Sequence, residues 1–359
     1  MKFIHTLQFS ICLLGLACFS SSCHYGKVKP TVNGSADTAS SHGDTLSAKI
    51  DFYTAKIIAN PNEADAYWNR GRLEFLKKNF GPSLADLTKA IKLDSTKSDY
   101  FYDLALVEFR VDRTRESKDA LITAVRLNPK NTSALLRLAQ LYYYVKKYPE
   151  AMDLIDQAMK INPYLTEEYS LKALIFMDKH DTAREISSLQ TVIEQDPKNF
   201  DAFIRIGILF KMQGNPIALS YFDNAMHLQP QNPESYYNKG LFYQSGRDYD
   251  NAIKAYTELL QIDSTYKLAY YSLGDIYNEY KKDYPKSIEY FNKAILCDST
   301  FSVAYFSRGN SYEMLKQNEK ALTDYAHAYR INPQFREAQS AYLKLLKITP
   351  PTSHGKLLN

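Results

Sequence analysis

The side chains that most often do chemistry, namely cysteine, histidine and clustered acids, are thinly spread along this chain of 359 residues. None of the spacings GxGxxG, GxxxxGK[ST], HExxH, CxxC or GxSxG occurs, so phosphate loops, zinc sites and nucleophile turns are not predicted. The histidines beyond residue 23 are scattered, and no two are spaced to share a metal: His24, His42, His180, His227, His327 and His354. We therefore expect no enzymatic activity, no cofactor and no metal site.

The balance of charge argues against nucleic-acid binding. The 44 Lys and Arg residues face 40 Asp and Glu residues, so the net charge of +4 gives no basic footprint for phosphate groups. Gly and Pro, at 13 and 14 residues, are too few for a collagen-like or Pro/Gly-rich disordered chain. Tyrosine is in excess, with 29 residues against one Trp. Such amphipathic rings must be buried, presented to a partner, or both.

One cysteine stands where a lipid could be attached. Residues 1–22 are typical of an export signal, because Lys2 precedes an apolar run that ends in small residues. The run is about 11 residues long, against the roughly 20 of a membrane-spanning helix. A cysteine after small residues resembles the end of a bacterial lipoprotein signal, in which the thiol receives lipid. Cys23 fits this pattern best and Cys18 is the alternative; a plain cleaved signal and an uncleaved signal anchor stay open.

A linker follows this signal. Residues 23–45 are rich in Ser, Thr, Gly and Asp without an apolar period, which predicts a flexible tether with a reach of roughly 25 Å. The lipoprotein resemblance implies a location in the cell envelope, and the absence of Asp directly after Cys23 favours the outer membrane, facing the periplasm. Cys297 is the only cysteine beyond Cys23, so no disulfide is expected and Cys297 is predicted to be packed.

A period of 34 residues organises most of the chain. A small residue recurs in steps of 33 to 35 residues: Gly71, Ala105, Ala139, Ala173, Gly207, Gly240, Gly274 and Gly309. A large apolar residue stands four positions before each one, and each unit ends in an acid or amide followed by Pro or Ser. Apolar residues spaced 3 and 4 apart predict two amphipathic helices per unit, which approach closely at the small residues.

This pattern resembles the tetratricopeptide repeat (TPR) family. The resemblance covers residues 64–335 as eight repeats and implies an all-α fold, an α-α superhelix of helix-turn-helix pairs. Residues 46–63 are predicted to form an N-terminal capping helix and residues 336–347 a C-terminal capping helix, with a tail over 348–359. The chain is therefore expected to be one elongated domain.

Three repeats depart from the pattern. Glu185 and Val192 occupy positions where the fourth repeat should have small residues. The fifth repeat lacks one residue near Pro216, and the seventh gains one near residues 283–285. The local curvature of the superhelix is expected to change at these places.

The resemblance also implies a concave groove lined by the first helix of each repeat. In that family the groove side chains come one residue after the large apolar column and at its helical neighbours. The residues predicted to line the groove are Trp68, Arg72, Phe75, Tyr102, Phe109, Tyr143, Ile204, Tyr237, Tyr271, Asp275, Asn278, Glu279, Phe306, Asn310 and Glu313. No Lys occupies the first groove column, so a clamp for a terminal carboxylate is not expected. Any one tyrosine could instead pack between neighbouring first helices.

These features predict a non-enzymatic scaffold that binds a protein or peptide and is joined to a lipid bilayer by its N-terminal anchor. The groove is mostly apolar and aromatic, but Asp275 and Glu279 have no opposing Lys or Arg. We therefore expect a ligand with apolar anchors and a basic end. Two alternatives stay open: a receptor for glycan or peptidoglycan fragments that stacks on the tyrosines, and a periplasmic assembly chaperone.

Overall fold

A computed structural model describes residues 42–348 of the protein, and this part is built from 18 α-helices with no strand. The predicted all-α fold of helix-turn-helix repeats is confirmed. The predicted export signal, Cys23, residues 24–41 of the predicted linker and residues 349–359 lie outside the described residues.

Each repeat is a pair of helices, here called the first and the second helix. The first helices are α3 (Ala64–Leu76), α5 (Ser98–Arg110), α7 (Thr132–Tyr144), α9 (Thr166–Asp178), α11 (Phe200–Met212), α13 (Pro233–Ser245), α15 (Lys267–Asp275) and α17 (Ser302–Met314). The second helices are α4 (Phe80–Leu93), α6 (Thr114–Leu127), α8 (Tyr148–Ile161), α10 (Thr182–Gln195), α12 (Ala218–Leu228), α14 (Tyr249–Ile262), α16 (Tyr284–Cys297) and α18 (Asn318–Ile331). The terminal helices are α2 (His42–Ala59) and α19 (Arg336–Ile348), so α2 begins within the segment predicted to be a linker.

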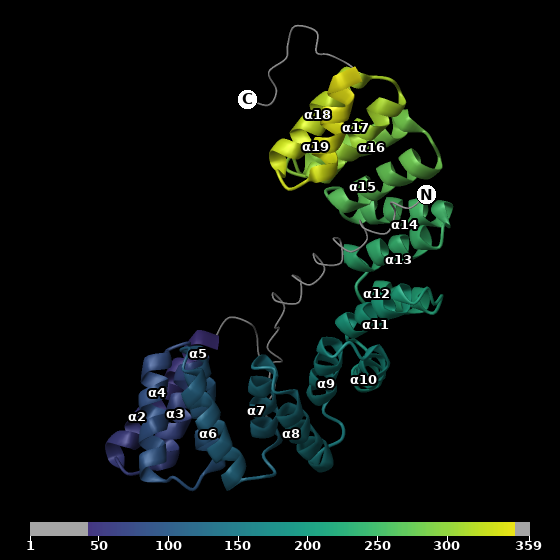
Figure 1. Cartoon of the computed structure of the whole chain (residues 1–359). Coiled ribbons are helices and arrows are strands. Elements are labelled where there is room, and N and C mark those ends of the chain that lie inside the picture. Colours follow the sequence, from purple (N-terminus) through teal and green to yellow (C-terminus); the bar gives the residue numbers. More distant parts are fainter. Residues whose placement is uncertain (1–41, 349–359) are drawn as a thin grey trace.

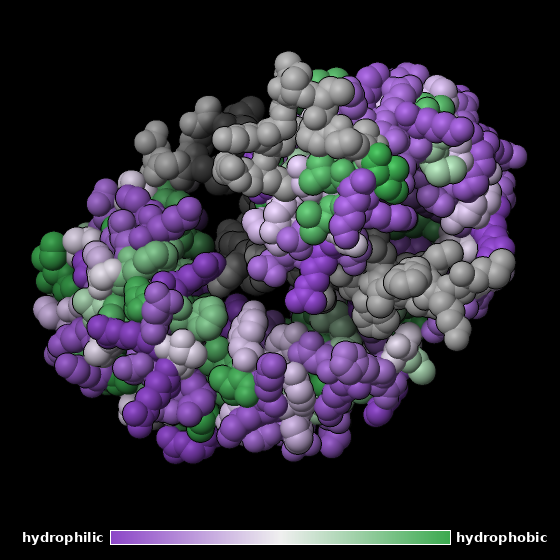
Figure 2. Space-filling view, turned by 45° about the horizontal axis from the view of Figure 1, so that its top comes forward, coloured by the Kyte–Doolittle hydropathy of each residue, from purple (hydrophilic) through white to green (hydrophobic). Residues whose placement is uncertain are grey.

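The pairs follow one another along an arc from α2–α6 at one end to α17–α19 at the other (Figure 1). In this view α9 lies on the inner side of the arc and α10 on the outer side. A hollow opens inside the arc, and hydrophobic patches interrupt the hydrophilic surface over the N-terminal repeats (Figure 2). The arc gives the first helices a long surface that a partner can follow.

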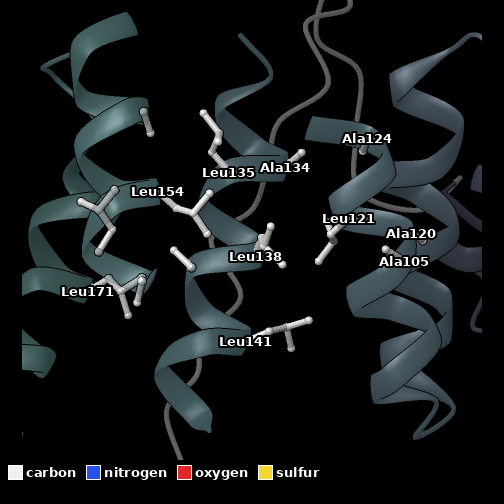
Figure 3. Packing of buried hydrophobic residues seen from close by; sticks show 14 of the residues in the cluster. Ala105, Ala120, Leu121, Ala124, Ala134, Leu135, Leu138, Leu141, Leu154 and Leu171 are labelled. Atoms are coloured by element: carbon white, nitrogen blue, oxygen red, sulfur yellow. The ribbon is translucent and has the colours of Figure 1, made fainter. Parts of the chain in front are cut away.

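The core runs along the arc as a series of neighbouring clusters. In the cluster of repeats 2–4, Leu135, Leu138 and Leu141 of α7 lie between α6, which contributes Leu121, and the helices that contribute Leu154 and Leu171 (Figure 3). Small residues allow the helices of each pair to approach closely, and Ala105 and Ala139 are fully buried. Each repeat therefore buries its apolar face only against its neighbours, as in other solenoids.

The turn between the two helices of a repeat has one backbone feature in common in all eight repeats. One residue of each turn has a left-handed conformation, with φ between 55° and 67°: Lys78, Asp112, Lys146, His180, Gly214, Arg247, Lys282 and Lys316. Seven of these eight residues are not glycine, although glycine adopts this conformation at the lowest cost. The sequence analysis did not identify this feature.

The irregular repeats absorb their changes locally. Val192 is buried in the fourth repeat, and the buried Glu185 carboxylate accepts a hydrogen bond of 2.5 Å from Nε of Arg205 in the next repeat. The missing residue of the fifth repeat leaves α12 with 11 residues, whereas the other second helices have 14.

Two predictions about the seventh repeat need correction. Its extra residue was expected near 283–285, but it is absorbed earlier, in a π-helical turn that continues α15 (η2, Ile276–Tyr280). Such a turn accommodates one added residue without breaking the helix. Cys297 was predicted to be packed, but it is exposed, because it is the last residue of α16 and lies beyond the buried face of that helix.

Candidate functional site

In six of the eight first helices, all except α11 and α15 with its continuation η2, one face carries no buried residue and points away from the core. Counted from the start of a first helix, residues 2, 5, 9, 12 and 13 fall within a strip about 100° wide. In α7 the buried residues, which include Leu135, Leu138 and Ala139, lie outside this strip. We call this strip, taken over all eight repeats and including η2, the inner stripe.

The inner stripe begins with an aromatic and charged cluster in repeats 1 and 2. Trp68 Nε1 donates a hydrogen bond of 2.6 Å to Oδ2 of Asp103, and the Arg72 guanidinium lies 3.2 Å from the same oxygen. Arg72 also lies over the Trp68 ring, 4.8 Å from the ring centre. Burial raises the pKa of Asp103 to about 6, although Arg72 and Trp68 oppose that shift. Asp103 was not predicted; it follows Tyr102, a predicted groove residue.

The rings that follow are half-buried and packed against the core. Phe75 contacts Phe80, and Tyr102, Phe109 and Tyr143 pack against the cluster of repeats 2–4. Burial and the Asp178 carboxylate raise the pKa of the Tyr143 hydroxyl to about 12. These four predicted groove residues therefore show a ligand only part of each ring.

In the last three repeats the ring on the inner stripe bridges neighbouring repeats. Each of these rings contacts one ring of its own second helix and one residue shortly before the next helix. The three sets are Tyr237 with Tyr256 and Tyr266, Tyr271 with Phe291 and Phe301, and Phe306 with Tyr325 and Phe335. These tyrosines fit the alternative in which the rings pack between repeats.

The polar residues of repeats 7 and 8 are joined to their own fold. Asn310 Oδ1 and Glu313 Oε2 lie 2.8 Å and 2.7 Å from the Tyr325 hydroxyl. Asp275 accepts a hydrogen bond of 3.1 Å from Gln244, and burial, with Glu279 nearby, raises the pKa of Asp275 to about 6. This end of the inner stripe therefore holds repeats together as well as facing solvent.

The structure corrects two of the predicted groove residues. Ile204 is 4% exposed and belongs to the core around Phe222. Asn278 is 6% exposed, donates a hydrogen bond to Glu279, and accepts one of 2.9 Å from Ser311 of the next repeat. The π-helical turn η2 contains Asn278 and alters the register in which it faces its neighbours. Neither side chain is available to a ligand.

The two edges of the inner stripe, at the start and at the end of the first helices, carry side chains that were not predicted. Exposed apolar side chains close four of the first helices: Leu76, Tyr144, Met212 and Met314. They stand eight residues after the first groove column, so helical spacing could have identified them. At the other edge, acidic side chains stand three residues before that column.

Two other kinds of site were sought in residues 42–348. No group of three or more His, Cys, Asp and Glu side chains there is arranged to hold a metal ion. None of the described helices combines the length and the apolar character that crossing a bilayer requires.

Sequence profiles described as tetratricopeptide repeat match residues 102–165, 233–266, 268–300 and 290–323. No curated protein matches the chain. Among solved structures, the C-terminal part of a TPR repeat-containing protein from Cytophaga hutchinsonii is 17% identical with a TM-score of 0.58, over 67% of this chain and 98% of that one. A TPR protein from Parabacteroides merdae is 14% identical with a TM-score of 0.48, over 69% and 98%. YrrB, described as a TPR protein with an unusual peptide-binding site, is 24% identical with a TM-score of 0.44, over 52% and 96%.

Proposed function

Because this chain is a tetratricopeptide repeat protein, we propose that it is a protein-binding scaffold whose ligand lies along the inner stripe. We further propose that lipid on Cys23 holds it in a cell-envelope assembly, at the outer membrane and facing the periplasm.

The observation that carries the scaffold proposal is the exposed apolar row of the inner stripe. Leu76, Tyr144 and Met212 are 62%, 61% and 71% exposed, although each closes a first helix that is otherwise packed. Along this edge they are separated by the polar residues Arg110 and Asp178 of the repeats between them. Exposed apolar side chains with polar neighbours are typical of interaction sites. Two shallow hollows of the described part lie elsewhere, on α19 and at residues 229–233. An open, elongated surface suits a polypeptide better than a small molecule, which prefers a concave pocket.

Crosslinking in cells tests the scaffold directly. We expect a discrete protein to be crosslinked to the full-length chain and to be identified by mass spectrometry. The variant Tyr144→Ser with Met212→Ser should lose that protein, because it removes two exposed anchors. The matched control is Ile122→Ser with Leu296→Ser, which changes two exposed apolar residues on second helices. Equal capture by both variants would argue that the inner stripe is not the binding surface.

The alternative of a glycan receptor depends on free ring faces. Most rings on the inner stripe contact other rings, as Tyr237 does with Tyr256 and Tyr266. This arrangement favours a protein ligand over a stacked sugar. Sedimentation of the chain with isolated peptidoglycan, at a level that Tyr144→Ser reduces, would reverse this preference. The chaperone alternative predicts transient clients, so a stable stoichiometric complex would count against it.

The anchor has its own test. Labelled fatty acid should be incorporated into the wild-type chain and the Cys18→Ser variant, and lost in Cys23→Ser. Label that survives Cys23→Ser and disappears in Cys18→Ser would move the lipid to the other cysteine. No label in either the wild type or the variants would favour a plain signal or an uncleaved signal anchor.

A further inference from the structure

One edge of the inner stripe is acidic. The second residue of the first helix is an acid in five of the first six repeats: Asp65, Asp99, Glu167, Asp201 and Glu234. All five are exposed. An acid anywhere in the first turn would satisfy the helix dipole. The dipole therefore does not explain why all five stand at the one position of the first turn that belongs to the inner stripe.

The opposite edge of the inner stripe alternates between apolar and polar side chains: in repeats 1–6, Leu76, Tyr144 and Met212 are separated by Arg110, Asp178 and Ser245. Leu76, Tyr144, Met212 and Met314 close their helices 11 residues after the acidic position. At the rise of an α-helix, this separates the two edges by about 16 Å. A ligand along the stripe therefore meets carboxylates on one side and, at every second repeat, an exposed apolar side chain on the other.

The charge of the inner stripe is opposite to that of the whole chain. Its cations are Arg72, Arg110 and Lys211. Its acids are Asp65, Asp99, Glu167, Asp178, Asp201, Glu234, Asp275, Glu279 and Glu313. Three cations against nine acids leave a formal charge of −6, and repeats 1–6 alone, which hold six of these acids and all three cations, carry −3, whereas the whole chain carries +4. The negative charge is therefore concentrated on the surface that faces the ligand.

We propose that the inner stripe of repeats 1–6 binds a basic amphipathic segment of a partner protein. Its Lys and Arg side chains lie along the acidic edge, and its apolar side chains contact the exposed apolar row. This inference rests on the proposed function, because it assumes that the ligand lies in the groove. It also moves the basic part of the ligand away from repeats 7 and 8.

The acids of neighbouring repeats are close enough to affect one another. Burial and the Asp201 carboxylate raise the pKa of Glu234, and Lys211 only partly opposes this shift. A cation supplied by a ligand between these carboxylates would relieve their repulsion. Electrostatic complementarity of this kind contributes chiefly to specificity and to the rate of association.

An extended segment matches the geometry of the two edges. Neighbouring helices pack about 8–10 Å apart, so the six first helices span roughly 45 Å. A strand of about 14 residues covers that distance, and its side chains alternate between two faces. The peptide (Lys-Leu)7 therefore presents all its lysines to one edge and all its leucines to the other, which makes it a suitable probe.

Fluorescence anisotropy with labelled (Lys-Leu)7 tests the acidic edge. The stripe variant is Glu167→Gln, Asp201→Asn, Glu234→Gln. The control is Asp119→Asn, Asp153→Asn, Glu194→Gln, which neutralises three exposed acids of second helices and changes the net charge equally. We expect at least tenfold weaker binding by the stripe variant and less than a twofold change in the control. The stripe variant should also show a shallower salt dependence, and (Glu-Leu)7 should not bind.

The outcomes separate the two proposals. Equal weakening of (Lys-Leu)7 binding by both triple variants would indicate unspecific charge attraction and overturn the inference. If the stripe variant binds normally while Tyr144→Ser with Met212→Ser binds weakly, the acidic edge is wrong but groove binding stands. If neither the stripe variant nor Tyr144→Ser with Met212→Ser changes binding of (Lys-Leu)7, the peptide binds elsewhere and both proposals lose their support. Failure of the wild type to bind (Lys-Leu)7 would also overturn the inference, leaving the scaffold to its crosslinking test. Circular dichroism of each variant verifies that it is folded.

Discussion

Repeats 2–4 and repeats 5–8 bring their two helices together with different residues. In repeats 2–4 the small residue of the first helix is Ala, and the residue 16 positions later is Leu or Ile: Leu121, Ile155 and Leu189. In repeats 5–8 the small residue is Gly, and it faces an aromatic ring of the second helix: Phe222, Tyr256, Phe291 and Tyr325. A Cβ atom added to these glycines would lie 2.4 to 2.7 Å from a ring carbon. A ring at this position therefore requires glycine opposite.

The difference extends to the inner stripe. The Tyr256 hydroxyl donates a hydrogen bond of 2.8 Å to Gln244, and the Tyr325 hydroxyl is within hydrogen-bond distance of Asn310 and Glu313. Leu and Ile cannot make such bonds, so the stripe of repeats 2–4 is not tied to its core in this way. The C-terminal repeats thus fix their polar stripe residues, whereas the acidic row proposed to meet a ligand lies mainly in the N-terminal repeats.

The largest effect should come from adding one methyl group in the C-terminal region. In Gly240→Ala the new Cβ would lie 2.4 Å from Cε1 of Tyr256, a ring that is fully buried and cannot move aside. We expect the variant to lose about 3 kcal/mol of unfolding free energy, the upper range for overpacking a core. Urea unfolding followed by circular dichroism measures this loss.

Repeat 1 supplies the control. Gly71 faces Leu87 instead of a ring, and an added Cβ would lie 3.0 Å from Cγ of Leu87 and 3.2 Å from Cβ of Asp86, farther than the 2.4 Å at Gly240. Gly71→Ala should therefore cost less than 1 kcal/mol. Tyr256→Leu introduced with Gly240→Ala recreates the pairing of repeats 2–4 and should recover more than half of the loss. Equal costs for the two alanine variants would show that ring and glycine are not coupled.

The sequence predicted these small residues but not what faces them. A period of 34 residues identifies the small residue of each first helix and the position that faces it on the second helix. Whether that position holds a ring or a Leu depends on contacts across the helix pair. The outcomes for Ile204 and Asn278 have related causes: Ile204 stands in the groove column yet packs on the core around Phe222, and Asn278 lies in a π-helical turn. The helices and repeats could be predicted because they depend on local spacing. Burial along the groove depends on how neighbouring repeats pack, which spacing alone does not encode.

The next largest effect concerns Glu168 of repeat 4, where the two regions meet. Its side chain is fully buried and neither carboxylate oxygen has a hydrogen-bond partner in the described residues, whereas Ala134 and Ala202 occupy the equivalent place in the flanking repeats. Burial raises the pKa of Glu168 to about 7 from an ordinary value of 4.5. The folded protein thus holds this proton more tightly than the unfolded chain, so the contribution of Glu168 to stability is most favourable below about pH 4.5 and becomes less favourable as the pH rises towards 7.

We therefore expect Glu168→Ala to raise the unfolding free energy by about 2 kcal/mol at pH 8 and by much less at pH 4.5, because it removes an unpartnered buried charge. Urea unfolding across this pH range measures the difference from the wild type. Glu168→Gln serves as the control, since it keeps the shape but cannot ionise and should remove the same pH dependence. An unchanged pH profile in both variants would show that Glu168 is solvated or paired.

A smaller effect tests the hydroxyl groups that distinguish the C-terminal region. Tyr325→Phe removes the donor to Glu313 and Asn310, and Tyr256→Phe removes the donor to Gln244. A net hydrogen bond is worth about 1 kcal/mol, and more when the acceptor is charged. Tyr325→Phe should therefore cost about 1.5 kcal/mol and Tyr256→Phe about 1 kcal/mol in urea unfolding. Tyr342→Phe, in α19, is a comparison variant because the Tyr342 hydroxyl has no hydrogen-bond partner among the described residues, and it should change stability less than either.

The smallest effect concerns the turns, where the two regions do not differ. Lys146 in repeat 3 and Lys316 in repeat 8 both have φ of 59°, a conformation that costs a side-chain-bearing residue about 1 kcal/mol and glycine almost nothing. Lys146→Gly and Lys316→Gly should each gain about 0.5 kcal/mol, because the greater flexibility of glycine in the unfolded chain offsets part of the relief. Gly214 stands at the equivalent turn with φ of 67°. Gly214→Ala should lose a similar amount of unfolding free energy because of this conformation, although its Cβ would meet no atom within 4 Å. Unequal gains at the two lysines would mean that the N-terminal and C-terminal regions also differ in their turns. The packing of each helix pair, and not the turn itself, would then determine the left-handed backbone conformation.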